Sequence, residues 1–207
     1  MLLDKLSLTE FCDELASKSP APGGGSVAAL SAALAASLGS MVAELTIQKK
    51  GYEGVQDQML SIAKQSKLLQ ERFIRAIDED AQSFNDFLAA SRLPKISNED
   101  KQIRFKRMQE ALQHACEVPY GVAQDAMTLF AIANELINKA NRNASSDAAV
   151  CAIEARAAVL AAVLNARINL ASVKDPLYVQ EMEKKLNYLE AQANVLESEI
   201  LKKSSLS

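Results

Sequence analysis

The fold is decided by residues 19–47, which read SPAPGGGSVAALSAALAASLGSMVAELTI. In this stretch, two prolines and three consecutive glycines precede a run of small and apolar residues from 27 to 47. Proline cannot continue a helix, and glycine allows positive φ and close approach of the backbone, so we expect a loop that leads into a helix. Because small side chains occupy nearly every position of that helix, we expect neighbouring helices to bury it on all sides.

The same stretch raises the question of a membrane. Ala, Ser and Gly dominate residues 27–43, Leu is sparse and Glu44 follows at once, so we predict no membrane association. The first fourteen residues include four acidic side chains in place of the basic start of a signal peptide. Three cysteines without metal-ligand spacing favour a reducing compartment. We therefore predict a cytoplasmic protein.

Length and composition limit the remaining possibilities. A chain of 207 residues with 49% hydrophobic content can bury a sizeable core, and we expect one domain over residues 1–207. The net charge of −3 and the scattered Lys and Arg residues disfavour a nucleic-acid partner. Because His114 is the only histidine, we predict neither a histidine-based metal centre nor a Ser-His-Asp triad.

Helical signals recur along the rest of the chain. Ser7 and Glu10 have capping-box spacing, and apolar residues repeat every three or four positions from 53 to 90. A helix begins near Ser97, is kinked or interrupted at Pro119 and continues to about residue 140. A second very apolar helix covers 148–173, and a last one with an apolar stripe follows residues 175–176. The sequence predicts an all-α antiparallel bundle with two buried helices.

Two features are candidates for a functional site. The glycine run followed by Ser26, a residue that can cap a helix, suits a carboxylate or another electron-rich group at a helix N-terminus, although a flexible linker or a tight turn explains it equally well. Asp80 lies three positions after Ile77 and four before Phe84, so it falls on the apolar stripe of its helix. A carboxylate there must be paired in a structural ion pair, protonated or used in chemistry.

Simpler interpretations are open for the other polar residues. Asp78 can be a surface charge, and Asp147 can be a helix N-cap. Residues 49–50, both lysine, can balance the C-terminal dipole of the preceding helix. Asn165 and Asn169 are four positions apart on one face of the second apolar helix, where each can satisfy buried polar neighbours.

Several motifs appear in one order along nearly the whole chain. They are residues 20–30 (PAPGGGSVAAL), 41–42, 45–46, 49–50, 78–81 with Phe84, 117–119, 141–143 with 146–147, and 165 with 168–170. On these residues, the chain resembles the cyclodeaminase/cyclohydrolase family of folate enzymes. It departs from the family at three positions where glycine is frequent, which here hold Gln48, Ala140 and Ala149.

The resemblance implies an all-α homodimer that acts on a tetrahydrofolate derivative, with no cofactor beyond that substrate and no metal. Methenyltetrahydrofolate cyclohydrolase is the expected activity, because the 207 residues contain no formiminotransferase domain. Formiminotetrahydrofolate cyclodeaminase is the alternative, and a non-catalytic folate-binding or scaffold protein is a further one.

The resemblance also implies a set of site residues. The expected catalytic residues are Asp80, Lys49 and, in reserve, Asp147. The expected substrate-binding residues are Pro22, Gly23, Gly24, Gly25, Ser26, Lys50, Asp78, Asn143 and Asn165. In either reaction one carboxyl, that of Asp80, transfers the proton, while a lysine holds the glutamate carboxylates of the folate or tunes that aspartate.

Overall fold

The computed structural model describes residues 2–204, and within them the chain forms six α-helices, three short 3-10 helices and no strand. In chain order these are η1 (Leu3–Lys5), α1 (Leu8–Leu15), α2 (Gly24–Glu44), η2 (Glu53–Val55), α3 (Gln56–Ser91), α4 (Asn98–Lys139), η3 (Arg142–Ala144), α5 (Ser145–Leu170) and α6 (Pro176–Lys203). The all-α prediction is confirmed.

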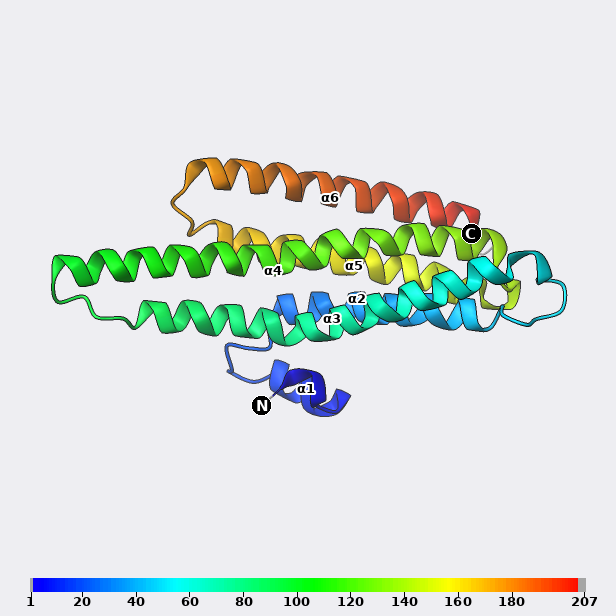
Figure 1. Ribbon diagram of the computed structural model, residues 1–207, viewed down its shortest axis with the longest axis horizontal. Helices are drawn as coiled ribbons and strands as arrows, with labels where there is room; N and C mark the ends of the chain where they lie inside the picture. Colours follow the sequence, from blue (N-terminus) through cyan, green and yellow to red (C-terminus); the bar gives the residue numbers. More distant parts are fainter. Residues whose placement is uncertain (1, 205–207) are drawn as a thin grey trace.

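The long helices form a bundle (Figure 1). Helices α3 and α4 lie side by side in front, with α2 and α5 behind them, and α6 runs along α4 and α5. The backbone N–H of Asn141, just before α5, donates to Thr46, just after α2, at 3.0 Å. Since the start of α5 meets the end of α2, these two helices are antiparallel. The start of α2 therefore lies near the end of α5, and we call residues 23–25 at this start the glycine turn.

Alanine allows the central helices to pack closely. Helices α2 and α5 pack against each other through faces rich in alanine. Helix α2 also packs against α3 and α4, and α5 packs against α4 and α6. Helix α2 is long and apolar enough to cross a membrane by length and composition alone, and here 56% of its most apolar window is buried inside the bundle. The expectation of burial on all sides is wrong, because Leu34 on α2 and Leu164 on α5 are 49% and 63% exposed. No other described element covers their outer face.

Helix starts follow the sequence signals in part. Capping boxes at Ser7 and Ser97 are confirmed. Ser26 and Asp147 are not caps, because their helices begin earlier, after the N-caps Gly23 and Ala144. Gly23 is extended and lets the helix start at the next glycine, so both polar residues lie in the first turn with their side chains free for other contacts.

Pro119 does not interrupt its helix. Helix α4 is continuous from Asn98 to Lys139 with this proline inside. Proline has no N–H, so it leaves the carbonyl of Ala115, four positions earlier, without its helical donor. The side-chain amide of Asn169 on α5 donates to that carbonyl at 2.8 Å. The predicted interruption is wrong, while the predicted kink stays a prediction. A neighbouring helix supplies the hydrogen bond that Pro119 cannot make.

Candidate functional site

The carboxyl of Asp80 lies directly on the first turn of α2. Asp80 comes from α3, and the Ser26 hydroxyl is 3.1 Å from its Oδ2 atom. A Cβ atom on Gly25 would overlap the carboxylate. Glycine is therefore required at position 25 for the close approach of Asp80.

Asn165 brings a third helix to the same turn. A Cβ atom on Gly24 would lie 2.7 Å from its Nδ2 atom, which donates to the Ala161 carbonyl at 3.1 Å. Gly24 is exposed, so the turn opens to solvent between Asp80 and Asn165. Positive φ is not the reason for these glycines, since only Gly51 among the described glycines has it. Close contact with side chains from α3 and α5 is the reason.

The environment of Asp80 favours its protonated form. Burial raises the pKa of Asp80, while the hydroxyl and the backbone N–H of Ser26 oppose the rise. Within residues 2–204 no ion pair includes this carboxyl, so the structural ion-pair interpretation finds no partner there. A half-buried carboxyl of this kind can exchange a proton with a bound molecule.

Asp78 is engaged by the N-terminal segment. Its two carboxylate oxygens accept hydrogen bonds from the backbone N–H groups of Leu3 at 2.7 Å and Asp4 at 3.1 Å. This contact fastens η1 to α3, where Leu3, Asp78 and Ala21 line one cavity. Pro22, which follows Ala21, is buried, and Gly23 is half-buried. Asp78 is thus more than a surface charge, and its contact with a substrate stays a prediction.

The remaining expected site residues lie at the other end of α2. Helix α2 has 21 residues and is therefore about 30 Å long. Lys49 and Lys50 follow its end, and Asn143 and Asp147 lie where η3 meets α5. The structure therefore brings together Gly24, Gly25, Ser26, Asp80 and Asn165. It places Lys49, Lys50, Asn143 and Asp147 far from them within one chain.

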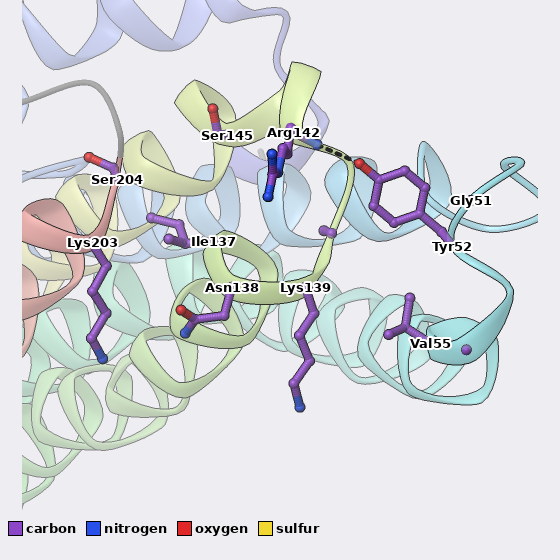
Figure 2. Close-up of a pocket in the computed structure, with 12 residues that line it drawn as sticks. Gly51, Tyr52, Val55, Ile137, Asn138, Lys139, Arg142, Ser145, Lys203 and Ser204 are labelled. Atoms are coloured by element: carbon purple, nitrogen blue, oxygen red, sulfur yellow. Dashed lines mark hydrogen bonds between the residues drawn. The ribbon is translucent and has the colours of Figure 1, made fainter.

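A basic cavity occupies that far end (Figure 2). Its volume is about 880 Å³, and its lining includes Lys139, Arg142 and Lys203. The hydroxyl of Tyr52 accepts a hydrogen bond from the backbone N–H of Arg142 at 3.1 Å, which joins the loop after α2 to the start of α5. Local sequence patterns could not indicate this cavity, because three segments far apart in the chain line it, residues 51–55, 137–145 and 203–204.

A second cavity lies between η1, α3 and α4. It has a volume of about 810 Å³ and is lined by residues that include Ala21, Glu79, Ala81 and His114. Asp80 lies between two of these lining residues in sequence but does not line the cavity itself. In the described range, no group of three or more His, Cys, Asp and Glu residues is arranged to hold a metal ion.

Comparisons with known proteins show the family of the chain. The sequence pattern of the formiminotransferase-cyclodeaminase family matches residues 7–188. A methenyltetrahydrofolate cyclohydrolase from Methylorubrum extorquens is 35% identical over 194 residues, which cover 94% of this chain and 93% of that protein. The formimidoyltransferase-cyclodeaminase of Sus scrofa is 33% identical over 88% of this chain, which spans only 34% of that longer protein.

A solved structure shares the fold. The crystal structure of a formiminotetrahydrofolate cyclodeaminase from Thermotoga maritima superposes with a TM-score of 0.86 at 30% identity and covers 97% of this chain and 96% of that one. The match in sequence and in fold extends over nearly the full length of the helical bundle. This chain belongs to the formiminotransferase-cyclodeaminase family.

Proposed function

We propose that this chain is a methenyltetrahydrofolate cyclohydrolase, which converts 5,10-methenyltetrahydrofolate and water into 10-formyltetrahydrofolate. The carboxyl of Asp80, half-buried against residues 24–26 at the start of α2 and with a raised pKa, carries the proposal. The M. extorquens cyclohydrolase supports the choice of reaction, because the similarity extends over 93% of that protein.

One carboxyl can perform both proton transfers of this reaction. As a carboxylate, Asp80 takes a proton from water while the water oxygen bonds to the cationic methenyl carbon and the C=N π electrons move to nitrogen. The resulting acid gives that proton to N5 as the bond from the carbon to N5 breaks. The remaining hydroxyl proton goes to solvent as the formyl C=O forms. A raised pKa brings the two protonation states of Asp80 closer in free energy near neutral pH.

Cyclodeamination is the second candidate, and the T. maritima structure favours it by its similarity over the full chain. In this reaction N10 of 5-formiminotetrahydrofolate attacks the formimino carbon, the C=N π electrons move to the imino nitrogen, and that nitrogen takes up the proton that N10 loses. The protonated form of Asp80 donates to the departing amine, and ammonia leaves as 5,10-methenyltetrahydrofolate forms. Both reactions use the Asp80 carboxyl, and 5,10-methenyltetrahydrofolate is the substrate of the first and the product of the second.

An assay of the purified protein with both substrates tests the proposal. A cyclohydrolase accelerates the loss of the methenyl chromophore beyond the rate with the Asp80→Asn protein, which also measures the spontaneous reaction. A cyclodeaminase instead produces that chromophore from 5-formiminotetrahydrofolate and releases ammonia. Folate binding without either reaction contradicts both and supports a non-catalytic binding or scaffold protein.

We further propose that the protein is a homodimer that meets through the outer face of α2 and α5. Exposed apolar side chains follow both helices on this face, and they are Leu34, Met41, Leu45, Val150, Ile153, Leu164 and Ile168. Contiguous exposed apolar surface marks interaction sites, and a two-fold dimer can bury the same face of both copies.

A dimer of this kind also accounts for the separation of the expected site residues. If the two-fold axis is perpendicular to α2 and α5, the two copies lie in opposite directions. The basic end of one copy, where Lys49 and Lys50 follow α2, then lies beside the glycine turn of its partner. Lys49, Asn143 and Asp147 of one copy then complete the site around Asp80 of the other. In this arrangement, Lys49 or Lys50 holds the glutamate carboxylates of the folate.

The proposal includes no cofactor beyond the folate and no metal, because water and one carboxyl suffice for the proton transfers. It also includes no nucleic-acid or membrane partner. It places one domain over residues 1–207 in the cytoplasm, as the charge and cysteine content favour.

A further inference from the structure

The hydroxyl of Ser26 has two possible acceptors inside the bundle. Ser26 is fully buried in the first turn of α2. Its Oγ atom is 3.1 Å from the carbonyl oxygen of Ile77 and also 3.1 Å from Oδ2 of Asp80. A hydroxyl carries one proton, so it donates to one of these oxygens at a time.

This arrangement keeps Asp80 hydrogen-bonded in every protonation state. When Asp80 is ionised, or carries its proton on Oδ1, the Ser26 hydroxyl donates to Oδ2. When the proton is on Oδ2, the acid donates to Ser26 and the hydroxyl turns to the carbonyl of Ile77. That carbonyl lies inside α3 and has its own helical donor, so it needs no second one. Protonation of Asp80 therefore leaves no buried polar atom of this group without a partner.

We propose that Ser26 is a positioning residue that holds the Asp80 carboxyl in one geometry while Asp80 accepts and returns the proton. The bond fixes Oδ2 and leaves Oδ1, over Gly25, as the oxygen that exchanges the proton with the substrate. The role differs from the direct substrate contact that the sequence implied for Ser26, and it rests on the proposed function.

Ser26 is the main hydrogen-bond partner of Asp80, because the charged side chains nearby have other partners or are exposed to solvent. On α3, Asp78 is held by backbone N–H groups of the N-terminal segment, and Glu79 is exposed. Arg167 on α5 is paired with two glutamates of α6, and α2 carries no charge before its last residue. The pKa of Asp80 is raised by burial and lowered by Ser26 alone, so loss of the hydroxyl raises it further.

Ser26→Ala tests this role by kinetics. We expect kcat to fall on the order of tenfold to a hundredfold with little change in KM. We expect the rising limb of the pH profile of kcat/KM to move up by about one to two pH units. Ser37→Ala is the matched control, because Ser37 lies in the same helix and donates to the Ala33 carbonyl away from the site. This control should leave the kinetics and the pH profile unchanged.

A raised KM with unchanged kcat and pH profile would overturn the proposal and make Ser26 a substrate contact. A second measurement needs no activity: carbon-13 NMR of the aspartate carboxyls in the substrate-free protein, with the Asp80 signal identified by its loss in Asp80→Asn. The midpoint of that signal should move to higher pH in Ser26→Ala, and an unmoved midpoint overturns the proposal. If the parent protein is inactive on both folates, the proposed function fails, and the NMR titration still decides the role of Ser26.

Discussion

Asp80 is the residue on which the proposed chemistry depends. In Asp80→Asn, the amide fits the space but cannot transfer a proton, so we expect kcat to fall by about 10²- to 10⁴-fold with folate binding retained. Burial raises the pKa of Asp80, so the parent protein loses stability as pH rises from the ordinary value to the raised one. The amide has no such loss, and the variant should unfold at the same or a higher temperature at pH 7.

Thermal unfolding at several pH values checks this prediction beside the kinetics. The stability difference between variant and parent should grow as pH rises through that window and stay constant above it. Asp86→Asn, at an exposed position of the same helix, should change neither activity nor this pH dependence. Full activity of Asp80→Asn would assign the proton transfer to another residue.

Gly25 provides a second test at the residue scale. The Cβ atom of Gly25→Ala would displace the carboxyl of Asp80, so we expect a loss of kcat of about tenfold or more while helix content is kept. Gly121→Ala is the control, because a Cβ atom there meets open space. Steady-state kinetics and circular dichroism decide between the outcomes. Equal activity of the two variants would show that the glycine only shapes a turn.

The helical spacing of apolar residues identified Asp80 as a candidate, but it did not explain why glycines stand at the start of α2. The position of Asp80 on an apolar stripe follows from helical spacing alone, and the structure places its carboxyl against the start of α2. Its role in catalysis stays a prediction. Sequence reasoning attributed the glycine run to freedom of φ and to close approach of a ligand at the helix N-terminus, with a linker or a tight turn as the alternative. The actual reason is the side chains of Asp80 and Asn165, which come from distant helices and leave no local mark in the sequence.

At the scale of elements, Asn169 and Pro119 should be energetically coupled. Asn169→Ala leaves the Ala115 carbonyl without its donor, and we expect a loss of about 1–3 kcal/mol in the free energy of unfolding. In Pro119→Ala, the new backbone N–H can reach the same carbonyl. The cost of Asn169→Ala should then be smaller in the Pro119→Ala background, as measured by a double-mutant cycle with urea unfolding.

An equal cost in both backgrounds would mean that the Asn169 amide does not replace the missing helical hydrogen bond.

Pro119 and Asn169 also show how far helices can be predicted from the sequence. Apolar spacing and capping residues are local, and they predicted every long helix to within a few residues. Helix α4 continues through Pro119, and the donor to the Ala115 carbonyl comes from α5, which a local rule cannot include.

At the scale of the whole molecule, the expected site residues divide into two groups. The first surrounds Asp80 at the start of α2, and the second follows the end of the same helix, which has 21 residues. Motif order in the sequence carried no information on this separation, because it does not say which ends of the helices meet. The exposed apolar face of α2 and α5 connects the two ends and is the surface that a second copy would cover.

Mixing two inactive variants tests whether the site is shared between copies. Asp80→Asn and the double variant Lys49→Ala/Asp147→Asn each damage one end, so each homodimer should be inactive. In a shared site, half of the dimers from an equal mixture have one intact site, and activity should recover to about a quarter of that of the parent. Co-expression forms the mixed dimers, and light scattering establishes their mass.

Each inactive variant mixed with itself is the control for this experiment. If one chain holds a complete site, every chain in the mixture keeps its own defect and no activity returns. Activity of the double variant alone would remove Lys49 and Asp147 from the catalytic group, and a fully active monomer would refute the dimer. Recovery in the mixture has one explanation, because only a site built from both copies can combine the intact Asp80 of one chain with the intact basic end of the other.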